Sequence, residues 1–185
     1  MYKTTSFILI TLALLFTGCL RSLHPLYTDK DIVFDKKIEG IWASIKDHKD
    51  MWIFHKSEDN AYDLIHAEKD APAKFQAHLV KLGKYLFLDI FPDQIDTKND
   101  FYRTHFLSVH TFSRIWFKED TLSLAILDND WMKDMISQNK ISIQHEQTEE
   151  GIVLIASTEE LQKFVLTYAE DPQAFPQSTT LVRKK

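Results

Sequence analysis

Apolar and polar residues alternate along most of the chain in short runs, with polar turns between them. In the run 51–56, for example, Trp52 and Phe54 would lie on one face of an extended chain, and Met51 and Ile53 on the other. A period of two predicts a β-strand. Strands are expected at 40–45, 51–56, 62–67, 75–82, 85–91, 104–117, 121–127, 141–146 and 152–156.

Short polar turns join several of these strands into pairs. Gly83-Lys84 and Lys118-Glu119-Asp120 each connect two predicted strands, and Thr148-Glu149-Glu150-Gly151 connects the last two. About eight or nine strands joined in this way indicate a mainly β fold. We predict an antiparallel meander that forms a closed or nearly closed barrel, because closure hides the unpaired strand edges.

Two segments break the alternation and predict helices. Residues 130–137 have apolar side chains three and four positions apart, which favours a short helix inserted between strands. Ser157 and Glu160 have the spacing of a capping box, and the apolar residues of 158–170 fall on one helical face. Pro172 ends this second helix, which we expect to pack on the barrel.

The first eighteen residues have the order of a secretory signal peptide. Lys3 is followed by the apolar run Phe7 to Phe16 and by the small pair Thr17-Gly18. The apolar run is too short for a membrane-spanning helix, which needs about 20 residues. We therefore assign 1–18 to a signal peptide.

The rest of the chain is expected to form one folded domain between two polar ends. Residues 19–30, which include Pro25, are interpreted as a modified N-terminus and a tether. Residues 31–175 are assigned to a single β-rich domain, and 176–185 to a polar, basic tail.

The pentapeptide Leu15-Phe16-Thr17-Gly18-Cys19 resembles the lipobox of bacterial lipoproteins. The resemblance implies a diacylglyceryl group on the Cys19 sulfur and a fatty acyl chain on its amine, which together anchor the mature protein to a membrane. Leu20 after the cysteine favours the outer membrane of the bacterial cell envelope, with the domain facing the periplasm. An ordinary signal peptide cut near a chance cysteine is the alternative.

Two further resemblances rest on the start of the mature chain. His24-Pro25-Leu26-Tyr27-Thr28 followed by Gly40-Ile41-Trp42 is similar to the opening of a group of small, uncharacterised bacterial lipoproteins. Gly40-Ile41-Trp42 ahead of a meander and a late helix resembles lipocalin-type barrels. That resemblance implies that Trp42 plugs the closed end of the barrel under a stacked arginine, for which Arg114 is the candidate. The Thr-Asp-Tyr turn of lipocalins is absent.

Composition and charge restrict the function classes. The chain has 185 residues, 44% of them hydrophobic, which suits a folded domain with its own core. Its net charge of −5 and the lack of a clustered basic face argue against nucleic-acid binding. The single cysteine leaves no partner for a disulfide.

Motifs that carry chemistry are not found in the sequence. The glycines of the mature chain, at 40, 83 and 151, are too far apart for a dinucleotide or phosphate-binding loop. His105 and His110 would lie on opposite faces of a strand, so no metal site is predicted. Asp128-Asn129-Asp130 and Glu159-Glu160 are explained by helix capping and the helix dipole. We expect no catalytic residues and no cofactor, and a hydrolase with dispersed residues is the least favoured alternative.

Aromatic side chains on the strands are the remaining candidates for function. An eight-stranded barrel is either filled by its own side chains or holds one small ligand. The leading hypothesis is a non-enzymatic membrane lipoprotein that binds a small apolar ligand or a lipid inside the barrel. The alternative is a solid domain that docks on an envelope protein. The predicted ligand-binding residues are Trp42, Trp52, Phe54, Phe87, Phe112 and Trp116.

Overall fold

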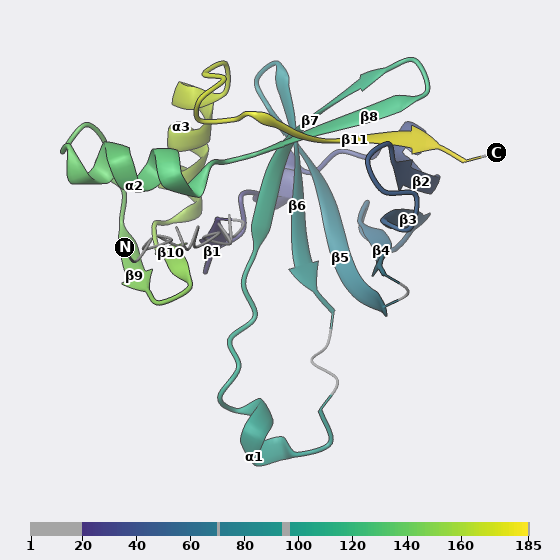
Figure 1. Ribbon diagram of the computed structural model, residues 1–185, viewed down its shortest axis with the longest axis horizontal. Coiled ribbons are helices and arrows are strands. Elements are labelled where there is room, and N and C mark those ends of the chain that lie inside the picture. Colours follow the sequence, from purple (N-terminus) through teal and green to yellow (C-terminus); the bar gives the residue numbers. More distant parts are fainter. Residues whose placement is uncertain (1–19, 70, 94–96, 185) are drawn as a thin grey trace, which may run out of the picture.

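The computed structural model describes residues 20–69, 71–93 and 97–184 as a β-barrel with a smaller layer of helices and strands on one side (Figure 1). The predicted signal peptide and Cys19 lie outside the described residues. The strands are β1 (Arg21–Ser22), β2 (Gly40–Ser44), β3 (Met51–Lys56), β4 (Tyr62–Glu68), β5 (Ala71–Leu82), β6 (Tyr85–Pro92), β7 (Thr111–Lys118), β8 (Thr121–Ile126), β9 (His145–Thr148), β10 (Gly151–Leu154) and β11 (Gln177–Arg183). The α-helices are α1 (Asp100–Arg103), α2 (Asn129–Ser137) and α3 (Thr158–Tyr168).

Eight antiparallel strands close the barrel, which confirms the predicted fold class. Strands β2 to β8 form the meander, and β11 pairs with both β8 and β2 to complete the ring. The predicted pair 141–146 and 152–156 is found as β9 and β10, but β9 begins four residues later than predicted, at His145. The two strands form a separate three-stranded sheet with β1. The closing strand therefore comes from the end of the chain, after α3.

Three segments differ from their predicted roles. Residues 104–110 are not part of β7, which begins at Thr111, and the chain before them forms the short helix α1. The region 176–185, predicted as a tail, contributes β11 to the barrel. The predicted tether is packed on the fold from Leu20 onward, with Leu20 and Leu26 buried. The polar strand β11 and the irregular segment 20–30 have too little hydrophobic periodicity to be predicted from the sequence.

The two predicted helices are confirmed, and α3 begins as the sequence indicates. The Ser157 side chain accepts a hydrogen bond from the Glu160 amide, while the Glu160 carboxylate accepts one from the Ser157 amide. Figure 1 shows α2, α3 and the small sheet on the same side of the barrel. Apolar side chains of α3 pack there against the outer face of β5 to β8. The sheet is thus covered on both faces over these strands.

Two hydrophobic clusters result from this arrangement. The interior cluster fills the barrel and contains Ile38, Trp42, Phe54, Tyr62, Leu64, Ala77, Leu79, Leu88, Ile115, Leu122, Leu124 and Leu181. The outer cluster lies between the barrel and the helical layer, and it includes Val80, Phe87, Phe112, Leu154, Leu161 and Val165. Alternate residues of β5 to β8 point into one cluster or the other.

Trp42 and Arg183 close one end of the barrel. The Arg183 guanidinium carbon lies 4.3 Å from the centre of the Trp42 ring, and the Trp42 indole Nε1 donates to the Ile38 carbonyl at 2.8 Å. Arg183 also donates to the carbonyls of Glu39 (2.6 Å) and Lys37. The short 3₁₀ turn Lys36–Ile38 is thereby held across this end, which we call the closed end.

Arg114, which the lipocalin resemblance suggested for the position over Trp42, lies elsewhere. Its guanidinium stacks on Tyr85 and Trp116 on the outer face of the barrel. It donates to the Ala169 carbonyl at the C-terminal end of α3, where a cation complements the helix dipole. Arg114 thus fixes α3 to the barrel, and Arg183 is the arginine that stacks on Trp42.

Replacement of Arg183 by alanine tests this closure. Arg183→Ala should lower the free energy of unfolding by about 2 kcal/mol, since it removes a cation–π contact and charge-assisted hydrogen bonds to backbone carbonyls. The neighbouring Lys184→Ala, which removes an exposed side chain, should change it by less than about 0.5 kcal/mol. Urea unfolding of both variants measures the difference. Equal stabilities would show that Arg183 does not hold the barrel closed.

Candidate functional site

The predicted ligand-binding residues fall into two groups on opposite faces of the sheet. Trp42, Trp52 and Phe54 belong to the barrel interior. Phe87, Phe112 and Trp116 pack in the outer cluster instead, so they do not line the same space. Both faces of β6 and β7 are apolar because helices cover the outside, and alternation alone therefore could not assign the inner face.

The end of the barrel away from the Lys36–Ile38 turn, where β3 begins and β6 ends, is here called the mouth. Trp52, Phe75 and Ile90 are only partly buried there and pack against the interior cluster. The register places Trp52 beside His66 across β3 and β4. The interior residues beyond them, such as Leu64, Leu79 and Leu88, are almost fully buried.

A polar group lies beside Trp52 at the mouth. The Asp50 Oδ1 atom accepts hydrogen bonds from the Trp52 indole Nε1 and from the His66 Nε2, each at 2.9 Å. The Trp52 and His66 ring centres are 4.7 Å apart. These bonds fix the orientation of the indole. Sequence reasoning missed Asp50 and His66, although the β3–β4 hairpin would have paired His66 with Trp52 once its register was known.

A buried carboxylate joins the N-terminal segment to the barrel on the outer face. Asp89, which is 1% exposed, accepts a hydrogen bond from the Leu26 amide through Oδ2 and one from His110 Nδ1 through Oδ1, each at 2.7 Å. His110 is itself buried and packs on Phe91. A buried carboxylate is stable only when such donors satisfy it. Asp89 therefore holds residues 20–30 on the fold.

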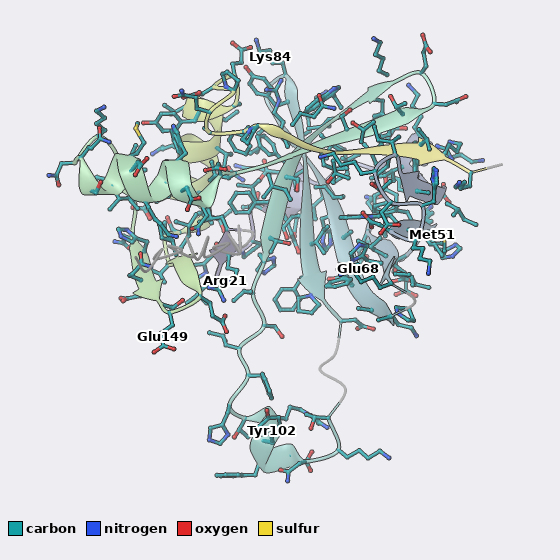
Figure 2. The ribbon with its side chains drawn as sticks, in the orientation of Figure 1. Arg21, Met51, Glu68, Lys84, Tyr102 and Glu149 are labelled. Atoms are coloured by element: carbon teal, nitrogen blue, oxygen red, sulfur yellow. The ribbon has the colours of Figure 1, made fainter. Side chains whose placement is uncertain are left out.

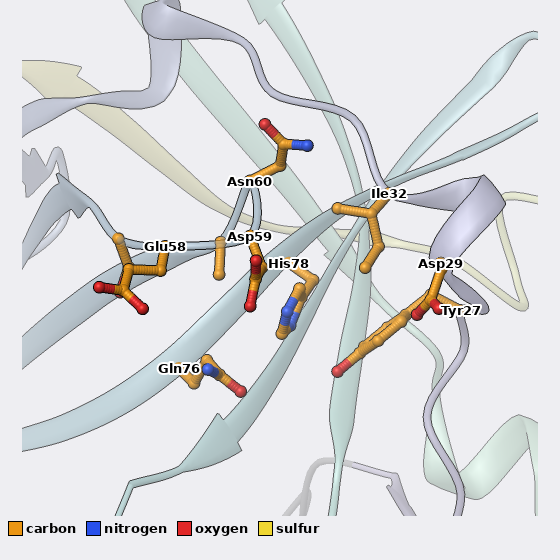
Figure 3. Close-up of a pocket in the computed structure, with 10 residues that line it drawn as sticks. Tyr27, Asp29, Ile32, Glu58, Asp59, Asn60, Gln76 and His78 are labelled. Carbon is orange, nitrogen blue, oxygen red and sulfur yellow. The ribbon is translucent and has the colours of Figure 1, made fainter.

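A surface cavity of about 730 Å³ lies at His78, the register partner of Asp89 on the neighbouring strand (Figure 3). Tyr27 and His78 line it, with ring centres 4.3 Å apart, and Asp29, Glu58 and Asp59 also belong to its lining. A second cavity, of about 520 Å³, separates α3 from residues 140–144. Both cavities are lined by residues outside the interior cluster, and the first is mainly polar.

Tyr27 and His78 face the first cavity as neutral groups. Burial, with Asp89 and Asp29 close by, raises the pKa of the Tyr27 phenol to about 12. Burial lowers the pKa of the His78 imidazole from its ordinary value of 6.5, with Asp89 opposing and His110 assisting. At neutral pH both groups can therefore exchange hydrogen bonds with a polar molecule without carrying charge.

The role of Asp89 is testable with an isosteric change. Asp89→Asn keeps the volume but cannot accept both hydrogen bonds, so the free energy of unfolding should fall by about 2 kcal/mol. The Leu26 amide should also exchange its hydrogen faster. Asp63→Asn, at an exposed position of β4, is the matched control and should leave both unchanged. Urea unfolding and hydrogen exchange supply the measurements, and wild-type protection of Leu26 in Asp89→Asn would refute the assignment.

Comparison with known proteins does not indicate a function for this chain. Protein-family models, curated protein sequences and solved structures give no match to this chain. Within 20–69, 71–93 and 97–184, no three His, Cys, Asp or Glu side chains gather as a possible metal site. No helix in this part of the chain is long and apolar enough to span a membrane.

Proposed function

We propose that this protein is a lipid-anchored, non-enzymatic protein of the bacterial cell envelope whose barrel binds a small apolar ligand or lipid. The observation that carries the proposal is the set of apolar side chains that line the inner face at the mouth and stay partly exposed. Trp42 and Arg183 cover the closed end, whereas the mouth leaves Trp52, Phe75 and Ile90 partly exposed on the inner face. Apolar side chains facing an opening are the usual lining of small-molecule sites.

The polar group at the mouth suggests the shape of the ligand. Asp50 and His66 are about one-quarter exposed and lie beside Trp52. A ligand with an apolar body and a polar head could place the body on Trp52 and Phe75, and the head beside Asp50 and His66. Lipids and fatty acyl derivatives have this form. The mouth thus favours an amphipathic ligand over a hydrocarbon.

The lipid anchor is supported by the lipobox resemblance and by the position of the first described residue. Leu20, directly after Cys19, is buried against the fold. A lipid on Cys19 would therefore hold the domain close to the bilayer surface, without an intervening spacer. Leu20 at this position also favours the outer membrane, with the domain facing the periplasm.

The hydrogen bonds of the buried polar groups support a non-enzymatic role. Asp89 and His110 form a pair of the kind that activates a nucleophile in hydrolases. Here Asp89 also binds the Leu26 amide, which gives the pair a structural task. Ser22 pairs with His110 through its backbone, but its hydroxyl donates to the His24 carbonyl. The pair is therefore best explained as a fastener for the N-terminal segment.

Native mass spectrometry tests ligand binding directly. Residues 20–185, exported to a bacterial periplasm and purified gently, should carry a bound mass that denaturation releases. Trp52→Ala should lower the occupied fraction at least about tenfold, since the loss of a large apolar contact costs more than 1.4 kcal/mol. Trp116→Ala removes a half-buried tryptophan from the outer face and should leave occupancy unchanged. A clean unliganded mass for the wild type would favour the docking-module alternative.

The anchor has an independent test in cells. Metabolic labelling with a fatty-acid analogue should mark the wild-type protein and place it in the membrane fraction. Cys19→Ala removes the acceptor thiol and should abolish the label. A protein that still carried the label after this substitution would refute the assignment of Cys19.

A further inference from the structure

The connection between β6 and β7 exposes a cluster of large apolar side chains. Residues 97–109, here called the aromatic loop, project away from the barrel and carry α1 near the tip (Figure 1). Phe101 is 77% exposed, Tyr102 58%, Phe106 45% and Leu107 72%. Single exposed apolar residues are common, but a group of this kind on one projecting segment marks an interaction surface.

Contacts within the aromatic loop fix the directions of these side chains. The Asn99 side chain accepts a hydrogen bond from the Tyr102 amide at 2.8 Å and caps α1. The Tyr102 and Phe106 ring centres lie 4.8 Å apart, and Phe101 packs on His105 at 4.9 Å. The rings are therefore held outward by the loop itself, and none of the four exposed residues belongs to either hydrophobic cluster.

The described part of the chain begins beside the base of this loop. Ser22 and His110, which immediately follows the aromatic loop, exchange two backbone hydrogen bonds: the Ser22 amide to the His110 carbonyl at 2.9 Å and the His110 amide to the Ser22 carbonyl at 2.8 Å. Cys19 stands only three residues before Ser22 in the sequence. A lipid on Cys19 would consequently bring the base of the aromatic loop to the membrane.

Charge and shape also fit a membrane surface. The cationic groups of the loop are Lys98, ahead of α1, and Arg103, which is exposed while it pairs with Asp100 at 3.3 Å and donates to the Thr97 carbonyl. Both can accompany the rings to the lipid phosphates at the interface. The acidic turn at Glu149 would be repelled by anionic lipid. Figure 2 shows the segment around Tyr102 extending beyond that turn, at the opposite end of the molecule from Lys84. The loop can therefore enter a bilayer without bringing Glu149 into it.

We propose that the aromatic loop inserts into the interfacial layer of the same bilayer that holds the lipid on Cys19. This inference rests on the proposed lipid anchor and deepens the proposed function, because the loop leaves the barrel at the mouth. Insertion would turn the mouth toward the bilayer. The ligand class that then has direct access to Trp52 is a membrane lipid or its acyl chain.

A single fluorescent label tests insertion in the complete lipidated protein. Lipidation consumes the thiol of Cys19, the one cysteine in the chain, so Leu107→Cys supplies a unique labelling site. An environment-sensitive dye there should shift to shorter wavelength in vesicles of phosphatidylethanolamine with a minority of phosphatidylglycerol. Spin-labelled lipid in those vesicles should quench it several-fold. The same dye on Lys84→Cys, in the exposed β5–β6 turn at the opposite end, should show neither effect.

A lipid-free protein separates the loop from the anchor. The exported chain beginning at Leu20 contains all the described strands and both hydrophobic clusters, and it should float with the same vesicles. The double change Phe101→Ser with Leu107→Ser should reduce the bound fraction at least about tenfold. Ile41→Ser with Ile45→Ser, which alters two exposed apolar residues of the barrel, should leave it unchanged.

The outcomes distinguish the loop from the other proposals. Mass spectrometry of each preparation reports the lipid on Cys19 and any barrel ligand. A lipidated protein whose label at 107 stays in a polar, unquenched environment would overturn insertion while leaving the anchor intact. If Cys19 carried no lipid, flotation of the lipid-free chain would still decide the loop. A wavelength shift that required envelope proteins in place of lipid would also overturn the proposal.

Discussion

The contact between Arg183 and Trp42 is the constraint on which the barrel depends. It joins β11, the last strand, to β2, the first strand of the barrel, and ties both to the 3₁₀ turn that covers the closed end. The same approach explains Gly40: a Cβ atom there would lie 2.8 Å from Arg183 Nη1, and the backbone φ of +116° disfavours other residues. Without β11, β2 and β8 would be unpaired edges. The barrel therefore closes only when β11 pairs with β2 and β8, which lie far from it in the sequence.

Sequence analysis predicted the parts of this fold whose signals are local. The alternating pattern gave the hairpins of the meander, and Ser157 with Glu160 gave the start of α3, because each signal lies within a few residues. The closing strand was missed because its role depends on partners in β2 and β8, while its own sequence is largely polar. In the sequence Arg183 looks like part of a basic tail, and only the structure shows that it stacks on Trp42.

The candidate site shows the same limit at the level of side-chain direction. Trp52 and Phe87 both stand on predicted strands, yet one faces the barrel interior and the other the helical layer. In a sheet with one solvent-exposed face, polar residues on that face would have shown which side chains point inward. Here apolar residues occupy both faces of the sheet. Only the strand register identifies which of the six predicted aromatic residues lie inside the barrel. The register also places His66 beside Trp52, where Asp50 bonds to both.

The N-terminal segment meets the fold at a fixed place. Asp89 fixes Leu26, and the backbone of Ser22 is paired with that of His110, so the chain reaches the fold at the base of the aromatic loop. A flexible tether would have left the barrel free to point in any direction. On the proposal that Cys19 carries a lipid, a segment fastened in this place would couple the anchor, the loop and the mouth, because the lipid would decide which end of the barrel meets the bilayer.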